Sequence, residues 1–364
     1  ELIRVQRLYD TRFGSAGSFG QNWKLDYEGI QIQADPLSDG WEGYVSITYC
    51  VRATESRLVT VSLSEDEKYY FYPRVVFPRS SSSCVNVSSP AGCLADEPVR
   101  YEFSPVPGGE GQLTLSQPST IRLWDYEDGY TGPMLVSTLA EDEFGFCEAT
   151  AYEPPLSNYT FTAPDGVQYR FDSNGKLYQR IDRNGNALTY TSTSITYSNA
   201  AVSGSTKQVT FTRDGSNRIT EIYDPIAIQT SGQPALKYAY DGSGNLTSFQ
   251  RQLNRAAATY ETTTYSYTNA SFPNHITQIS GSCCAADVRN DYDTIGRLIR
   301  QYDGLNNISS YAYDLTGRRY YVTNRLGGVS IRVFYDSGLP QSDINPLGGV
   351  KTFTYDDEGR RIQQ

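Results

Sequence analysis

Aspartates that stand three residues before a glycine recur along the second half of the sequence, and their spacing is the feature that could support chemistry. The pairs are Asp172 with Gly175, Asp241 with Gly244, Asp293 with Gly296, Asp314 with Gly317, and Asp356 with Gly359. Carboxylates repeated on a β-scaffold could bind calcium. Each turn supplies only a single carboxylate, however, and an Asp that opens a turn accepts backbone N–H bonds while the Gly adopts a left-handed conformation that closes the hairpin with a bulge. We therefore interpret these pairs as structural turns and expect no metal site and no cofactor.

Three acidic clusters and one histidine are the remaining candidates for catalysis. The clusters lie within residues 65–67, 125–128 and 141–143. Paired carboxylates perform glycoside hydrolysis, but runs of charge are usually solvated faces. His275 is the single histidine of the chain, and triads or zinc sites built on histidine need further partners. We expect no catalytic residues, and we predict that the chain is not an enzyme.

Six cysteines indicate the redox compartment. They are Cys50, Cys84, Cys93, Cys147, Cys283 and Cys284. An even number in a chain that looks secreted favours disulfides, although the spacing does not choose among the pairings. Metal ligation is the competing interpretation, but no two cysteines are separated by two residues as in metal-binding pairs. Neighbouring cysteines on a strand point to opposite faces, so Cys283 and Cys284 are expected to have different partners, with a ring between them as the other possibility.

Composition excludes several classes of protein. The 31 Lys and Arg and 41 Asp and Glu give a net charge of −10, which argues against a nucleic-acid-binding surface or a polybasic membrane anchor. The aromatic content of 13% argues against disorder. No run of apolar residues is long enough to predict a membrane-spanning helix. Because the chain begins at Glu1 without a leader, we expect an extracellular or cell-surface product whose signal peptide has been removed.

The elements that must hold the aspartates repeat at a fixed period. Asp293, Asp314, Asp336 and Asp356 follow one another at 20 to 22 residues, and such a period indicates a repeat architecture. Second turns lie between the repeat units, at residues 182–186, 303–307, 324–328 and 345–349. The flanking residues are rich in Tyr, Ile, Thr, Val and Phe, which suit strands. The pattern predicts an all-β fold, a long antiparallel ribbon with two strands and two turns per repeat; the best helix candidate is short and covers residues 250–258.

The chain divides into three parts by pattern. Residues 1–30 precede the repeats, and residues 158–364 contain them. Residues 31–157 hold four of the six cysteines and many prolines, and we expect a β-rich, cysteine-containing cap or insert there. Within the repeats, Tyr and Trp could stack on sugars, but aromatic rings on a sheet more often form cross-strand ladders. Three arginines that directly follow a turn glycine fit as stacked partners in such ladders: Arg297, Arg318 and Arg360.

The repeats resemble those of the RHS or YD-repeat family. The stretch from Tyr159 to Asp172 reads YTFTAPDGVQYRFD, and the turn 182–186 reads DRNGN. The opening RLYD of Arg7 to Asp10, with GQNW from Gly20, is similar to the segment that precedes such repeats. The resemblance covers 158–364 well, 1–30 moderately and 31–157 poorly. It implies a β-ribbon that spirals into a shell, barrel or tube, as in bacterial RHS polymorphic toxins, insecticidal toxin-complex shells and teneurin-like receptors.

One departure from the family shapes the functional expectation. Toxin members close their shell with a DPxG core segment that self-cleaves, whereas the nearest match here carries Asn345 in place of the Asp and lies within an ordinary repeat. We expect a non-catalytic extracellular scaffold that assembles head to tail into a fibre or tube, because a free sheet edge is a template for another strand. The alternatives are a fragment of a toxin-encapsulating shell, and a cell-surface adhesion or glycan-binding module. Expected partners are further copies and a cell-surface glycan or protein, with no nucleic acid and no membrane span.

Overall fold

The computed structural model confirms the all-β prediction. It describes residues 3–37, 41–45, 49–53, 57–65, 67–77, 84–85, 98–117, 121–124, 134–141, 147–202, 204–230, 232–281, 288–355, 359 and 361–363. Within these ranges the elements are 35 strands, one short α-helix and three 3-10 helices. The chain forms two compact units, here called unit 1 (Glu1–Arg4 and Asp26–Gln208) and unit 2 (Val5–Leu25 and Val209–Gln364). Within the described residues, no helix has the length and apolar character needed to span a membrane.

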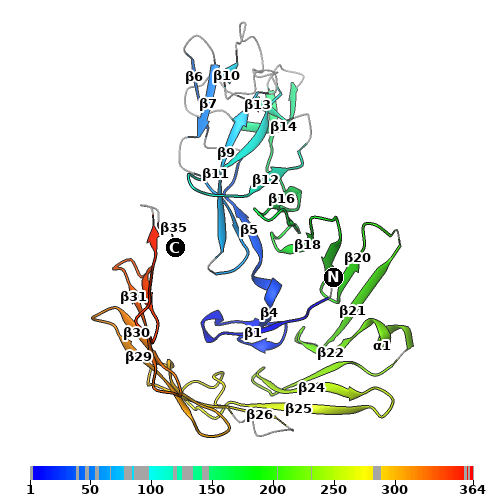
Figure 1. Ribbon diagram of the computed structural model, residues 1–364. Helices are drawn as coiled ribbons and strands as arrows, with labels where there is room; N and C mark the ends of the chain where they lie inside the picture. Colours follow the sequence, from blue (N-terminus) through cyan, green and yellow to red (C-terminus); the bar gives the residue numbers. More distant parts are fainter. Residues whose placement is uncertain are drawn as a thin grey trace. The chain divides into compact units, whose positions relative to one another are not determined.

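Nineteen strands form one antiparallel sheet (Figure 1). Their hydrogen-bonded order is β12, then β16, then every strand to β33 in chain order, so most of the sheet is a meander. The strands up to the division between the units, which falls inside β21, are β12 (Gln112–Leu115), β16 (Tyr159–Thr162), β17 (Gln168–Phe171), β18 (Leu177–Ile181), β19 (Ala187–Tyr190), β20 (Ser194–Ser198) and β21 (Thr206–Arg213). The strands of unit 2 are β22 (Ile219–Tyr223), β23 (Leu236–Tyr240), β24 (Leu246–Asn254), β25 (Thr259–Ser266), β26 (Gln278–Gly281), β27 (Val288–Tyr292), β28 (Leu298–Tyr302), β29 (Ile308–Asp314), β30 (Arg319–Thr323), β31 (Val329–Phe334), β32 (Pro340–Ile344) and β33 (Val350–Thr352).

The helix prediction for residues 250–258 is wrong. Residues 250–254 belong to strand β24, and Arg251 forms an ion pair with Glu261 of the opposite strand β25 at 2.5 Å. Pairing with a neighbouring strand therefore overrides the weak local preference for a helix. The single α-helix, α1, spans Pro225–Thr230 instead, where the Asp224 side chain accepts a hydrogen bond from the Ala227 N–H at 2.8 Å and caps the first turn.

Unit 1 has a sandwich-like core. A four-stranded sheet in the order β11 (Arg100–Pro105), β9 (Lys68–Val76), β8 (Val59–Ser62) and β5 (Gln31–Ala34) packs on the first strands of the large sheet. Alternating residues of β8, Val59 and Val61, are fully buried, as expected for a strand with one face in the core. The ring of Phe161 on β16 lies 4.6 Å from Tyr69 and 5.9 Å from Phe71 on β9. Residues that the sequence resemblance covers poorly therefore bury the start of the repeats.

Smaller sheets complete the described structure. Two have three strands: β10 (Cys84–Val85), β7 (Tyr49–Ala53) and β6 (Trp41–Val45) in one, and β13 (Arg122–Trp124), β14 (Met134–Glu141) and β15 (Cys147–Ala151) in the other. A pair near the end of the chain contains β34 (Thr354–Tyr355) and β35 (Arg361–Gln363). The 3-10 helices are η1 (Thr11–Phe13), η2 (Asp26–Gly29) and η3 (Leu156–Asn158). The region 31–157 is rich in strands where it is described, as the sequence predicts.

The N-terminal segment of unit 2, residues 5–25, lies against the meander of the same unit. It contains β1 (Arg7–Tyr9), β2 (Ala16–Gly17), β3 (Gly20–Gln21) and β4 (Trp23–Leu25), and β1 pairs with β4. Phe19 is fully buried, with its ring 4.8 Å from Tyr238 of β23. Figure 1 shows β1 and β4, coloured blue, beside the strands of this unit. A segment more than 200 residues away in sequence thus fills the apolar face of the repeats.

Candidate functional site

One five-residue turn serves eight connections of the large sheet. Its first residue, Asp or Asn, accepts hydrogen bonds on side-chain Oδ1 from the backbone N–H groups of the third and fifth residues. The first N–H donates to the fifth carbonyl, and the fourth N–H donates to the first carbonyl, with all four distances between 2.8 and 3.1 Å. The turns are residues 172–176, 182–186, 214–218, 241–245, 293–297, 303–307, 324–328 and 345–349.

The turn explains three of the predicted Asp–Gly pairs. The glycines at the fourth position, Gly175, Gly244 and Gly296, have φ angles of 75°, 86° and 86°, which residues with a Cβ rarely adopt. In all three hairpins the pairing register shifts just before the turn, as a bulge requires, for example between Asp291 and Tyr292. The first-position carboxylates are thus engaged by backbone donors.

The remaining pairs differ. Strand β29 continues to Asp314, and β30 begins at Arg319, so the connection holds four residues. Asp314 accepts from the Gly317 N–H at 2.8 Å, but the left-handed residue is Arg318, with φ 51°, and not Gly317 as expected. The turn around Asp336 opens at Tyr335, whose carbonyl accepts from Gly338 N–H at 3.0 Å. In the last pair Gly359 has φ 78°, whereas Asp356 lies outside the described residues.

Tyrosine and arginine tie two of the turns, 214–218 and 293–297, to the next repeat. Arg297, the fifth residue of its turn, donates to Asp293 at 2.7 Å and lies 4.6 Å from the ring centre of Tyr313. The Tyr313 hydroxyl donates to the Leu298 carbonyl at 3.0 Å. Burial of the ring raises the pKa of Tyr313, so the hydroxyl stays protonated and remains a donor.

The same arrangement recurs earlier in the ribbon, at turn 214–218. Arg218 donates to Asp214 at 2.8 Å and stacks at 4.4 Å on Tyr240, whose hydroxyl donates to the Ile219 carbonyl at 2.5 Å. Buried rings with satisfied hydroxyl groups explain why Tyr precedes the turn Asp. Of the other predicted ladder arginines, Arg318 forms an ion pair with Asp336, and Arg360 lies outside the described residues.

Replacing the first turn residue tests the network. Asp241 accepts from the Ser243 and Asn245 N–H groups and from the Asn245 side chain, at 2.9, 2.9 and 3.0 Å. We expect Asp241→Ala to lower the free energy of unfolding by about 1–2 kcal/mol, because it leaves these donors without their acceptor. Asp241→Asn is the control and should cost less than about 0.5 kcal/mol, since Asn324 and Asn345 occupy this position in their own turns. Urea unfolding of both variants measures the difference, and equal losses would contradict the role assigned to Oδ1.

Acid is expected to weaken the turns. Hydrogen bonds from the Asn186 and Asn307 side chains are the largest cause that lowers the pKa of Asp182 and Asp303 from the ordinary value of 3.8. Because the folded-state pKa lies below the unfolded-state pKa, these carboxylates stabilise the fold above about pH 4, and that contribution is lost as pH falls through the folded-state pKa. We expect the midpoint temperature of thermal unfolding to decrease when the pH is lowered below 4. The decrease should be smaller in the Asp182→Asn and Asp303→Asn variants. A midpoint that is flat down to pH 2 would refute this.

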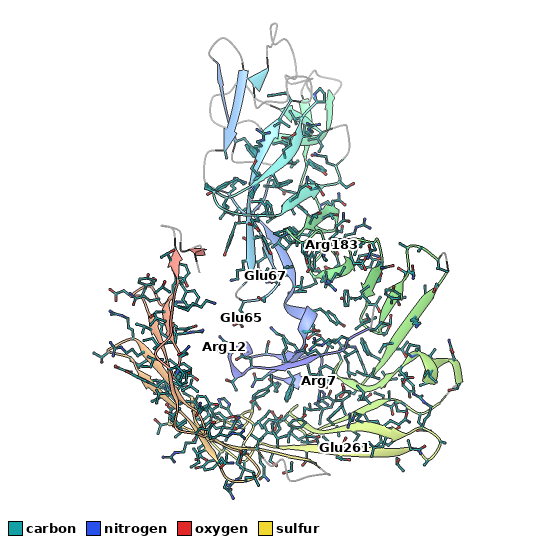
Figure 2. The ribbon with its side chains drawn as sticks, viewed as in Figure 1. Arg7, Arg12, Glu65, Glu67, Arg183 and Glu261 are labelled. Atoms are coloured by element: carbon teal, nitrogen blue, oxygen red, sulfur yellow. The ribbon has the colours of Figure 1, made fainter. Side chains whose placement is uncertain are left out.

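An arginine inside an aromatic cluster anchors the N-terminal segment of unit 2 (Figure 2). The Arg7 guanidinium carbon lies 4.1 Å from the ring centre of Phe249, 5.2 Å from Tyr238, 5.6 Å from Trp23 and 5.8 Å from Phe19. The cation is thus held by ring faces, and its Nη1 is buried with no hydrogen-bond partner among the described residues. The RLYD match points to this segment, but nothing local to it identifies residues 238 and 249 as partners.

Two of the candidates for catalysis, His275 and Glu67, contact neighbouring residues of the fold. His275 Nε2 lies 3.1 Å from the Gly296 carbonyl, and its ring packs 5.0 Å from Phe272 and 4.9 Å from Tyr292. Burial lowers the pKa of His275. Glu67 closes the hairpin between β8 and β9 and accepts from the Tyr69 hydroxyl at 2.8 Å. The side chains of the other two acidic clusters lie outside the described residues, as does that of residue 66.

A groove of about 740 Å³ crosses strands β25 to β28 of unit 2. Its polar groups largely bond one another: the Tyr302 hydroxyl donates to Asp291 at 3.0 Å, and the Asn290 side chain donates to the Ile276 carbonyl at 2.9 Å. Arg289 stacks 4.9 Å from the ring centre of Tyr302. Groups that already satisfy one another leave few donors or acceptors for a sugar, so the groove favours structural packing.

The cysteines are described only in part. Cys84 on β10 is the register partner of Cys50 on β7, and Cys147 begins β15. Cys93, Cys283 and Cys284 lie outside the described residues, so disulfide formation stays a prediction. Among the residues that the structure describes, no group of three or more His, Cys, Asp or Glu is arranged to hold a metal ion.

Comparisons with known proteins return likenesses to solved structures alone. No protein-family model matches the chain, and no curated protein matches it. The crystal structure of TcdB2-TccC3-TEV shares 12% identity with a TM-score of 0.29, over 91% of this chain and 17% of that one. The crystal structure of TcdB2-TccC3 shares 11% identity at a TM-score of 0.18, over 85% of this chain and 22% of that one. A structure of the Photorhabdus luminescens Tc holotoxin pore shares 11% identity at 0.18, over 84% and 21%. The chain therefore spans about a fifth of the length of these solved chains.

Proposed function

We propose that this chain is a non-catalytic, extracellular structural scaffold of the YD-repeat type, which assembles head to tail with further copies. The turn network carries the proposal: eight connections use the same four hydrogen bonds. The recurring Asp side chains, which could have served chemistry, accept hydrogen bonds within their own turns, and Arg218 and Arg297 link two of the turns to a Tyr of the next repeat. A ribbon built in this way gains length by adding repeats, because each repeat contacts mainly its neighbours.

Edge strands supply the means of assembly. Among the strands that the structure describes, β12 and β33 each have one neighbour in the large sheet. The outer backbone groups of such strands are a template for pairing with another chain. If the β12 edge of one copy pairs with the β33 edge of the next copy, the contact is head to tail. Such a contact repeats along a filament unless the rotation between copies closes a ring.

An extracellular location accords with the even number of cysteines. The register of β10 with β7, which sets Cys84 opposite Cys50, supports a disulfide there, because cross-strand partners have Cα atoms within disulfide reach. Peptide mapping without reduction would find these two cysteines linked in the secreted protein.

Electron microscopy of the native, undigested protein tests the assembly. Regular fibres or tubes built from subunits of 40.6 kDa would support the scaffold proposal. Isolated closed particles with a larger subunit mass would instead make this chain one piece of a toxin-encapsulating shell, and dispersed monomers would refute head-to-tail assembly.

A further inference from the structure

Three leucines stand exposed at the same place in successive turns of unit 2. Leu305, Leu326 and Leu347 are each the third residue of a five-residue turn, and they follow one another at 21 residues. Their exposed fractions are 81%, 88% and 95%. An exposed leucine on its own needs no explanation, but an ordered row of them marks a contact surface.

The meander sets all three leucines on one edge of the sheet. They lie in the β28–β29, β30–β31 and β32–β33 connections, and alternate connections of an antiparallel meander fall on the same side. Three residues after each leucine, a strand opens with a partly exposed aliphatic residue: Ile308, Val329 and Val350. The same edge carries exposed side chains of α1 and of the end of β24, namely Ile226, Ile228 and Leu253. We call the three leucines with Ile308, Val329 and Val350 the leucine edge.

The turn itself does not require leucine. The third position is Asn174, Asn184, Ser216 and Ser243 in four other turns that have the same hydrogen bonds, and Ile295 in a fifth. Leucine at this position therefore adds nothing to the turn, and its exposure to water is unfavourable because the side chain is apolar. Its function must lie in a contact outside the turn.

The opposite edge of unit 2 is used differently. There the N-terminal segment contacts the connections: the Gln21 N–H donates to the Gly244 carbonyl at 3.0 Å, and the Tyr9 hydroxyl donates to the Asn274 carbonyl at 2.9 Å. Among the described residues of that edge, the large exposed apolar side chains are Ile295 and Leu315. The two edges thus differ in that one receives a segment of its own chain, whereas the other carries three leucines at a constant interval of 21 residues.

From this we infer that the leucine edge is a lateral contact surface for the leucine edge of a second copy of this chain. Successive leucines are about 10 Å apart, because two strand spacings of about 4.8 Å separate them. A partner must offer apolar side chains at the same interval, and the same edge of another copy does so. Two copies related by a two-fold axis would set the rows against each other.

Charge favours a second copy over a lipid surface. In a chain with a net charge of −10, the three turns hold one acidic and one basic residue, Asp303 and Arg325, whose charged groups lie 3.9 Å apart. The row is therefore neutral, and two copies can approach without repulsion between like charges. Anionic membranes attract clusters of Lys and Arg, and these turns contain no such cluster.

The inference rests on the proposed scaffold function, but it uses different atoms. Head-to-tail assembly pairs the backbones of edge strands, whereas the lateral contact pairs side chains at turn tips. The matching experiment is light scattering and analytical ultracentrifugation of the full chain over a wide range of concentration. It compares the wild type with the triple variant Leu305→Asn, Leu326→Asn, Leu347→Asn. Asn at this turn position is already present as Asn174 and Asn184, so the variant keeps the turn chemistry.

The expected result is a wild-type lateral pair whose dissociation constant rises about 100-fold or more in the triple variant. The control is the double variant Ile295→Asn, Leu315→Asn on the opposite edge, which should associate as the wild type does. If the wild type forms the lateral pair but no fibres, head-to-tail assembly is refuted and the lateral contact is not. Three results would overturn the lateral contact. The wild type and the triple variant could associate equally, or the wild type could stay monomeric at every concentration. The third is a wild type that instead sediments with uncharged phosphatidylcholine vesicles.

Discussion

Gly20→Ala is expected to lower the free energy of unfolding of unit 2 by about 3 kcal/mol, through backbone strain and a steric clash together. Gly20 has a φ angle of 90°, and a Cβ atom placed there would lie 2.2 Å from the Gly244 carbonyl oxygen and 3.2 Å from the Tyr240 ring. The backbone would have to move away, which breaks the hydrogen bond from Gln21 N–H to that same carbonyl. The N-terminal segment would then lose its fit against the meander.

Gly327 provides the matched control. Its φ angle is 82°, and a Cβ atom there would have nothing within 4 Å. Gly327→Ala therefore carries the backbone strain alone, about 1–2 kcal/mol. Urea unfolding gives the free energies, and hydrogen exchange at the Gln21 amide reports the local contact. If both variants lose the same stability and Gln21 stays protected, the close approach of Gly20 to Gly244 does not hold the segment.

In unit 1, Phe161→Ala is expected to cost about 3–5 kcal/mol, the range for removing a fully buried aromatic ring. Phe161 is 0% exposed, and its ring contacts Tyr69, Phe71 and Tyr169 at centroid distances of 4.6, 5.9 and 5.9 Å. The substitution leaves a cavity between the four-stranded sheet and the large sheet, and both sheets meet at this ring.

The control for this variant is Tyr178→Ala on β18 of the same sheet. Tyr178 is 46% exposed, so its removal should change the stability by no more than about 0.5 kcal/mol. Thermal unfolding of both variants separates the two cases. A small effect of Phe161→Ala would mean that the four-stranded sheet does not depend on the start of the repeats for its core.

The comparison of the two edges of unit 2 shows what the repeat pattern hides. The period of 21 residues is visible in the sequence for the turn aspartates and equally for Leu305, Leu326 and Leu347. In the sequence the leucines look like ordinary residues beside strands, and only the order of strands in the meander shows that they lie on one edge. Likewise, Asn324 and Asn345 perform the task of the turn Asp, because the backbone donors need a side-chain oxygen and not a charge.

The ribbon was predictable from the sequence because its determinants are local. An Asp or Asn at the first turn position, a left-handed residue at the fourth, and strand-forming residues between turns act within a few positions of one another. They therefore specify strand, turn and antiparallel neighbour without reference to the rest of the chain. Where the local signals were weak, as for residues 250–258 or at Gly317 and Arg318, pairing between strands decided the conformation.

Only the tertiary structure decided which surfaces these strands cover. The burial of β16 by β9, and the docking of Arg7 among Phe19, Trp23, Tyr238 and Phe249, join residues that lie tens to hundreds of positions apart. No local propensity encodes such pairs, because apolar burial has no direction and selects partners by shape and area. The amino-acid sequence by itself thus determined a long antiparallel ribbon with fixed turns. Packing determined which face is filled from within the chain and which turn tips stay exposed.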